Sequence, residues 1–198
     1  YAALFALCMV IGGFANDVGR WKQFLETARV AVDTREHLAW QNLERNPLPK
    51  MRNGNFVEDS AYLRIAWAKV AVEQILEHPL GFGYGHKAFG WAVNDGFGLE
   101  SGIESSHSGI LDFTLANGIP GIVLWLAFSV ALIRFGLRSF GVSGSPAGLM
   151  LALSVIGYLI RCVLDGHLSG WRLEMYGLIV GILVALIAGG NDRESGTS

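Results

Sequence analysis

Long apolar runs occupy the beginning and the last third of the chain, and the stretch between them mixes apolar with charged positions. Three runs are long enough to cross a lipid bilayer as helices, which takes about 20 apolar residues. They cover residues 119–137, with Pro120 in the opening turn, residues 147–164, and residues 171–188, which begin with an interfacial tryptophan. A shorter run over residues 1–15 ends at an Asn-Asp pair, and we expect it to be the last part of a truncated transmembrane helix. The pattern predicts an all-α integral membrane protein built as a polytopic helix bundle.

The polar stretch, residues 19–118, is expected to be a large and partly helical loop. Its pattern predicts one or two surface helices over residues 20–44, followed by a connector of helix-breaking residues over 46–54. A helix from Ser60 to about Glu77 comes next. A glycine turn over 81–85 and an irregular glycine-rich segment over 91–106 complete the stretch. Ser60 is expected to cap the helix that begins there. This helix ends at Glu77 because His78 precedes a proline, and a residue in that position disfavours the helical conformation.

Composition agrees with this division of the chain. Hydrophobic residues make up 52% of the sequence and charged residues 16%, against about 25% charged in an average soluble domain. Of the Asp, Glu, Lys and Arg residues, 22 lie within residues 19–118 and six within residues 119–190. A net charge of −2 leaves no basic surface for nucleic acid, and two cysteines inside apolar runs do not make a disulfide scaffold.

The expected organisation has four parts: a truncated span over 1–18, a loop over 19–118, three spans over 119–190 and a tail over 191–198. Arg134 and Arg138 flank the short connection between the first two full spans, and Arg193 lies in the tail. Short loops rich in Lys and Arg stay on the cytoplasmic side of a membrane. We therefore expect a cytoplasmic tail and a large loop on the outer side, in a chain that is part of a larger membrane protein.

Arg64 is the first candidate for a functional residue. The other charged residues on its predicted helix, between positions 69 and 77, fall within an arc of about 80°, and Arg64 lies at least about 140° away from them. A guanidinium keeps its charge and offers a fork of donors that suits phosphate or carboxylate. We expect it to meet an anion from elsewhere, either a loop carboxylate such as Glu100 or Glu104 or an anionic substrate.

His107 is the second candidate. It is followed by Ser108 and, after nine further residues, by Gly118-Ile-Pro-Gly121 at the start of the first full span. The apolar residues 110–115 predict a short helix that leads to the membrane, with Asp112 on it. A histidine at this level lies at the edge of the bilayer, where an imidazole can exchange protons near neutral pH. It is therefore a candidate general base, with a structural role as the alternative.

Two other arrangements of the same residue types are weaker. Ser106, His107 and Asp112 are the residues of a hydrolase triad, but sequence neighbours on a helix do not face each other. His78 and His86, taken with His107, lack the close spacing of a metal site. We therefore expect neither a triad nor a metal site, and no cofactor.

The sequence around His107 resembles a motif of the O-antigen ligase and Wzy-type O-antigen polymerase superfamily of bacterial envelopes. The resemblance rests on His107-Ser108, nine residues, then Gly118-x2-Gly121, and it extends upstream through Arg64-x2-Trp67 and the His-Pro-Leu-Gly-Phe-Gly-Tyr-Gly stretch of residues 78–85. The glycines of the motif are Gly81, Gly83, Gly85, Gly118 and Gly121. The matching part covers about residues 55–130, and the rest of the chain is similar only in its hydropathy.

The resemblance implies a polytopic inner-membrane protein with a large periplasmic loop and a fold like that of the metal-independent, lipid-linked membrane glycosyltransferases. The implied donor is a glycan on undecaprenyl diphosphate, and the acceptor is a saccharide or the lipid A core. Arg64 would bind the diphosphate leaving group, and His107 would be the general base on the acceptor hydroxyl. Ser108 would orient His107, while Gly118 and Gly121 would let the following helix pack closely.

One family element has no counterpart in this sequence. The family carries a further arginine in a Ser-Arg-Gly-like element at the start of the helix that residues 1–15 are expected to finish, and Arg20 lies on the wrong side of that helix to replace it. We therefore expect this chain to be inactive on its own.

The competing hypothesis is a non-catalytic membrane module or a portion of a transporter, in which Arg64 and His107 only tie the outer loop to the bundle. A polar path between spans would then be lined by Arg161, Asp165, His167 and Glu174. Arg161 and Asp165 are four residues apart near the outer end of their span, so the simplest expectation is that they neutralise each other.

Overall fold

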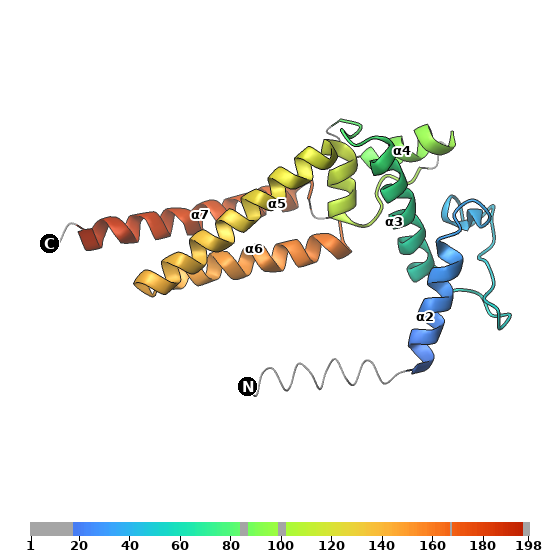
Figure 1. The fold of residues 1–198 in the computed structure, drawn as a ribbon, viewed down its shortest axis with the longest axis horizontal. Coiled ribbons are helices and arrows are strands. Elements are labelled where there is room, and N and C mark those ends of the chain that lie inside the picture. The colour runs from blue at the N-terminus through green and yellow to red at the C-terminus, as the bar shows by residue number, and fades with distance from the viewer. Residues whose placement is uncertain (1–17, 84–86, 99–101, 167, 196–198) are drawn as a thin grey trace. The chain divides into compact units, whose positions relative to one another are not determined.

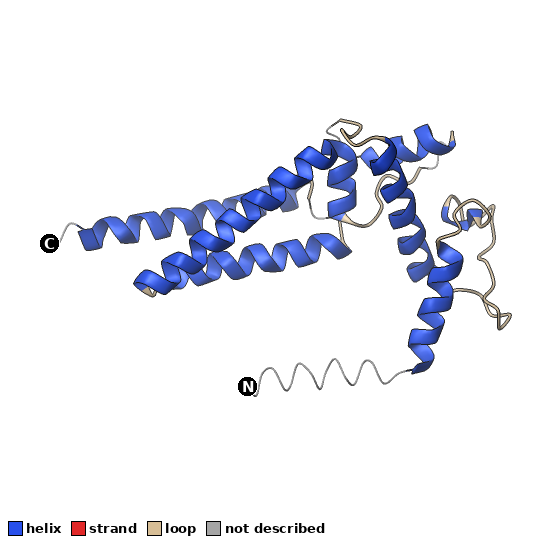
Figure 2. Ribbon diagram, viewed as in Figure 1, coloured by secondary structure: helices blue, strands red, loops and turns tan. Residues whose placement is uncertain are grey.

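The computed structural model describes residues 18–83, 87–98, 102–166 and 168–195, in two compact units that comprise residues 1–70 and 71–198. Helices dominate both units, and the described residues contain no strand beyond a single antiparallel bridge between Lys50 and Phe56 (Figure 2). The predicted truncated span over residues 1–18 lies outside the described residues, apart from Val18, where helix α2 begins. The all-helical prediction is confirmed for the described part of the chain.

The first unit contains helix α2 (Val18–Ala31), the short 3-10 helix η1 (Leu38–Trp40) and the beginning of α3 (Asp59–Glu77). The prediction of one or two surface helices over residues 20–44 is confirmed in part, since α2 accounts for the first and a single 3-10 turn stands in place of the second. The predicted connector over 46–54 is non-helical and carries the bridge to Phe56.

Two aromatic side chains form the centre of the first unit, Trp40 and Tyr62, which are 1% and 0% exposed. The indole N–H of Trp40 donates to the carbonyl of Thr34 at 2.9 Å, and that of Trp67 donates to the carbonyl of Trp40 at 3.0 Å. The Tyr62 hydroxyl donates to the carbonyl of His37 at 2.9 Å. Burial raises the pKa of Tyr62 above its ordinary value of 10.0, because a phenolate is poorly solvated there.

Helix α3 begins one residue earlier than predicted and has a different cap. The carboxylate of Glu58 accepts a hydrogen bond from the N–H of Ala61 at 2.6 Å, so Glu58 satisfies this first-turn donor and the prediction that Ser60 caps the helix is wrong. The negative charge of this side chain also interacts favourably with the positive end of the helix dipole. The helix ends at Glu77, as the proline after His78 predicts.

In the second unit, helix α4 (Ala88–Phe97) occupies part of the segment 91–106 that the glycines predicted to be irregular, so that prediction is wrong there. Its buried apolar residues recur at helical spacing: Ala88, Phe89, Ala92 and Val93. The glycines of α4 serve close packing instead of breaking the helix. A Cβ at Gly90 would lie 2.9 Å from a carbonyl oxygen of the following segment, and one at Gly96 would lie 2.5 Å from the side chain of Gln74.

The three remaining helices are long and apolar enough to cross a membrane: α5 (Gly109–Ser143), α6 (Pro146–Leu164) and α7 (Gly170–Ser195) (Figure 1). They confirm the three predicted spans as helices. Helix α5 continues beyond Leu137, where the first span was expected to end, and α7 continues into the predicted tail over 191–198. That tail is therefore helical up to its fifth residue.

Helix α6 packs against both α5 and α7. The rings of Tyr158 and Tyr176 stack at a centroid distance of 3.8 Å between α6 and α7. Other leucines on the three helices are exposed: Leu124 on α5 at 72%, Leu164 on α6 at 67% and Leu186 on α7 at 60%. Apolar surface of this kind is expected on helices that face lipid.

Helices α5 and α6 approach each other closely at a pair of glycines. A Cβ at Gly136 would lie 2.5 Å from the carbonyl oxygen of Gly148, and a Cβ at Gly148 would lie 2.5 Å from that of Gly136. Small residues at such crossings let membrane helices pack backbone to backbone.

Candidate functional site

Helix α5 contains a sharp break at Gly118, whose φ and ψ of 70° and −179° are far from helical values. The break separates a short segment, residues 109–117, from the apolar part of the helix, residues 119–143. This conformation is accessible almost only to glycine. Pro120 follows in the first turn of the second segment, as the sequence predicts, where its missing N–H costs nothing.

The glycine turn that follows α3 lies directly against this break. A Cβ at Gly81 would lie 2.5 Å from the main-chain nitrogen of Gly118, and a Cβ at Gly118 would lie 2.5 Å from the carbonyl carbon of Leu80. Gly81 also has a positive φ of 79°. The two glycine motifs, separated in sequence by α4 and the His107 loop, therefore touch backbone to backbone.

Hydrogen bonds fasten this contact, and together they replace the helical bonds that the break removes. They run from the N–H of Phe82 to the carbonyl of Leu115 at 2.8 Å, from the N–H of Gly83 to the carbonyl of Ala116 at 3.0 Å, and from the N–H of Ile119 to the carbonyl of Pro79 at 2.8 Å. A helix end needs such partners for its unpaired groups. The turn thus caps the segment that ends before Gly118 and the segment that begins after it, and we call this contact the glycine interlock.

The other motif glycines have different surroundings. A Cβ at Gly121 would collide with the Cβ of Asn117, which the break places over it, so Gly121 serves the break itself and not the packing of another helix. That differs from the expected role. Gly83 has a φ of 99° with no atom near the position of a Cβ, and Gly85 lies outside the described residues.

His107 lies in the loop before α5 and has a φ of 60°, which is uncommon for a residue with a side chain. Asp112 holds the loop: its carboxylate accepts hydrogen bonds from the hydroxyl of Ser105 at 2.7 Å and from the N–H of Ser106 at 2.9 Å. The hydroxyl oxygen of Ser105 in turn accepts from the N–H of His107 at 3.0 Å. Strained backbone persists only where its surroundings fix it. Asp112 is thus the residue that positions the His107 backbone.

Ser108 takes part in this loop through its main chain. Its carbonyl accepts hydrogen bonds from the N–H of Asp112 at 2.9 Å and from the hydroxyl of Ser106 at 3.4 Å. Its N–H donates to the same Ser106 hydroxyl at 3.3 Å. The hydroxyl that contacts the His107 main chain belongs to Ser105, a residue that the sequence pattern does not single out.

A pocket of about 300 Å³ opens beside the loop, where the start of α5, the end of α6 and the start of α7 meet. His107 and Asp112 line it together with Asp165, which follows α6, and Arg172, in the first turn of α7. The N–H of Gly109 donates to the carbonyl of Asp165 at 3.1 Å and so joins the beginning of α5 to the end of α6. His107 thus lies in the wall of a polar pocket at one end of three apolar helices.

The sequence pattern does not predict Arg172 as a residue of this pocket. One signal for it exists: Arg172 follows an expected interfacial tryptophan, Trp171, at the start of the third span, and so belongs to the same membrane end as His107. The predicted pair of Arg161 and Asp165 is confirmed, with Nη2 and Oδ2 3.6 Å apart.

Arg64 lies on α3 within the first unit, and its side chain is exposed. Of the two carboxylates proposed as its partner, Glu104 forms an ion pair with Lys87, and Glu100 lies outside the described residues. Among the described residues no carboxylate lies within ion-pair distance of Arg64. The role of Arg64 stays a prediction from the sequence.

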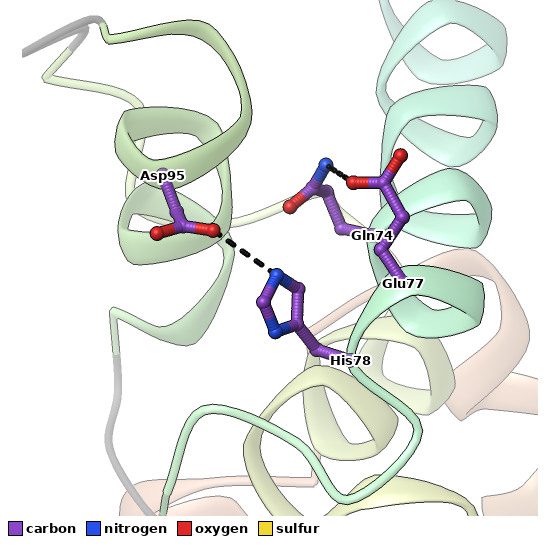
Figure 3. Close-up of polar contacts among 4 residues, drawn as sticks. All are labelled: Gln74, Glu77, His78 and Asp95. Atoms are coloured by element: carbon purple, nitrogen blue, oxygen red, sulfur yellow. Dashed lines mark hydrogen bonds and ion pairs between the residues drawn. The ribbon is translucent and has the colours of Figure 1, made fainter.

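Figure 3 shows a polar contact away from the pocket. The Nε2 atom of His78 lies 3.0 Å from a carboxylate oxygen of Asp95 on α4. Nearby, the amide of Gln74, which is 3% exposed, donates to the carboxylate of Glu77 at 2.8 Å. His86 lies outside the described residues, and within the described ranges no three His, Cys, Asp or Glu side chains lie close enough together to hold a metal ion.

No family model matches the sequence, and searches of curated proteins and of solved structures give no match either. The chemistry open to the pocket follows from its own groups. An imidazole can accept a proton from a hydroxyl, and a guanidinium can bind an anion. Both lie in one pocket at the end of helices suited to lipid.

Proposed function

We propose that this chain is part of a membrane glycosyltransferase that transfers or polymerises a glycan from an undecaprenyl-diphosphate donor onto an acceptor hydroxyl, without a metal ion. The observation that carries the proposal is the pocket at one end of the three apolar helices, with His107 in its wall. A lipid-linked donor has an apolar tail and an anionic head, so it needs apolar surface beside a polar pocket. The glycine interlock supports the proposal, because it joins two stretches on which the family resemblance rests.

In the proposed reaction His107 accepts the proton of the acceptor hydroxyl. The acceptor oxygen attacks the anomeric carbon of the donor sugar while the bond from that carbon to the diphosphate oxygen breaks. The diphosphate leaves with the bonding electron pair, and cations stabilise the charge that develops on it. Such a direct attack inverts the configuration at the anomeric carbon. Arg64 keeps, within this proposal, the role of diphosphate ligand that the resemblance gives it.

The proposed location is the bacterial inner membrane, with the pocket on the periplasmic side. Arg134 and Arg138 lie toward the far end of α5 from His107, next to the connection to α6. The positive-inside rule places that connection in the cytoplasm and thus the pocket on the opposite side. The acceptor is a saccharide or the lipid A core.

The test is the activity of the His107→Ala and Arg64→Ala variants of the full-length protein, produced in its own cells. Transfer of the glycan is followed by gel mobility and glycan staining. We expect both substitutions to abolish transfer while membrane levels stay the same. The matched control is His37→Gln, which removes a histidine side chain outside the pocket and outside the motifs and keeps the main-chain carbonyl that Tyr62 uses. Normal transfer by the His107 variant would refute the mechanism.

Normal glycan transfer by the His107 variant would instead favour the competing hypothesis of a transporter portion or a non-catalytic module. The structure offers it little support, because Arg161 and Asp165 already neutralise each other. His167, the third residue of that polar path, lies outside the described residues.

A further inference from the structure

The pocket beside His107 contains two carboxylates whose oxygens are engaged by the protein itself. Asp112 accepts hydrogen bonds on one oxygen from Ser105 and on the other from Ser106. Asp165 accepts the N–H of Gly166 at 2.8 Å on one oxygen, and its other oxygen faces Arg161 at 3.6 Å. These acids therefore hold the loops that form the pocket, and Arg161 partly compensates the charge of Asp165.

Arg172 lines the same pocket, and unlike the two carboxylates it has no ion-pair or hydrogen-bond partner of its own among the described side chains. Its guanidinium carbon lies 5.7 Å from the centroid of the neighbouring Trp171 ring, a cation–π contact. Within the described ranges no carboxylate lies within ion-pair distance of it. The side chain is exposed, so its planar fork of donors can be reached by a ligand in the pocket.

We propose that Arg172 binds a phosphate group of a ligand that occupies this pocket. A guanidinium can hold two oxygens of one phosphate at once, which a lone ammonium cannot match in geometry. The position of Arg172 in the first turn of α7 adds the partial positive charge of a helix N-terminus to the same place. The phosphate-binding role stands on these contacts alone, whereas the view that the phosphate belongs to a glycan donor rests on the proposed function.

The pocket lies where the apolar parts of α5, α6 and α7 begin or end, so a ligand can place a phosphate on Arg172 and an apolar chain along the helices. A free phosphate compound and the head group of a lipid share this chemistry. Two probes separate them. Inorganic diphosphate carries the charge alone, and farnesyl diphosphate adds a short polyprenyl chain.

The experiment measures the affinity of the purified full-length protein for each probe by isothermal titration calorimetry, in a detergent free of phospholipid. We expect Arg172→Ala to weaken the binding of both probes by about tenfold or more, since a charge-assisted contact to phosphate is lost. Arg172→Lys should bind with intermediate affinity, because it keeps the charge and loses the fork. The matched control is Arg138→Ala, at the other end of α5, which should bind as the wild type does.

Tighter binding of farnesyl diphosphate than of inorganic diphosphate would assign the phosphate to a lipid-linked ligand, and equal binding would assign it to a soluble one. Wild-type affinity in Arg172→Ala, or no saturable binding of either probe, would overturn the inference. Failure of the proposed function looks different, because His107→Ala would then transfer glycan normally while Arg172→Ala still lost affinity for diphosphate.

Discussion

Replacing Gly118 by alanine tests the glycine interlock most directly. The backbone at Gly118 has a φ of 70° and a ψ of −179°, a conformation that costs a residue with a side chain about 1–3 kcal/mol. The new Cβ would also lie 2.5 Å from the carbonyl carbon of Leu80 and 2.6 Å from the carbonyl oxygen of Pro79. These are main-chain atoms, so the turn itself must move.

The two costs add, because one arises within residue 118 and the other from its neighbours. Overpacking of this kind costs about 1–3 kcal/mol, so the expected loss of unfolding free energy is about 2–6 kcal/mol. At about 2–4 °C per kcal/mol for a chain of this length, that corresponds to a fall in the melting temperature of about 4–24 °C. The hydrogen bonds from Phe82, Gly83 and Ile119 should weaken together, because they share this one contact.

The assay is thermal unfolding of the detergent-solubilised protein, followed by tryptophan fluorescence. The matched control is Gly141→Ala in the same helix, where a Cβ would meet no atom within 4 Å and alanine should be neutral or slightly stabilising. A Gly118→Ala protein that melts with the wild type, while Gly141→Ala behaves as expected, would refute the view that this glycine is required by the interlock.

Two further predictions concern other contacts. Gly136→Ala should lower the unfolding free energy by about 1–3 kcal/mol, because its Cβ would meet the carbonyl oxygen of Gly148, whereas Gly157→Ala on an open face of α6 should not; chemical denaturation of both variants checks this. Tyr62→Phe should cost about 1 kcal/mol near pH 7, since it leaves the partly buried carbonyl of His37 without its donor. Because the folded pKa of Tyr62 is raised, the contribution of its neutral hydroxyl is present below pH 10 and is lost as the pH rises above that value. Denaturation at pH 7 and pH 11 should therefore show a smaller difference between wild type and Tyr62→Phe at the higher pH, and an unchanged difference would contradict the reasoning.

The three apolar helices could be predicted from the sequence because a helix that crosses lipid must carry an unbroken apolar run, and few other structures share that pattern. The position of Pro120 followed from the same logic, since proline is tolerated only in the first turn. Helix α4 was missed because Gly90 and Gly96 suggested breaks, while in the structure they make room for neighbouring atoms. Pattern reasoning has no access to such tertiary contacts.

The site was predictable only residue by residue. His107 was found through its position between a polar loop and an apolar helix, a property of the local sequence. Arg172 joins it because α6 returns the chain to the same end of the bundle, where α7 begins; the neighbouring Trp171 marks that membrane end in the sequence, but no local pattern brings Arg172 to the pocket. The same holds for Asp112, whose hydrogen bonds run back to a loop that its own helix follows.

The glycine interlock also divides the chain into parts that tolerate changes in length differently. The turn at residues 82–83 is hydrogen-bonded to residues 115–116, so the intervening segment is a loop whose two ends are already closed. Doubling the length of a closed loop costs only about 0.6 kcal/mol in chain entropy. Insertions between α4 and the His107 loop should therefore leave the break in α5 intact. The spacing from His107 to Gly121 has no such freedom, because one added residue would rotate the short segment by about 100° and carry its carbonyls away from the turn.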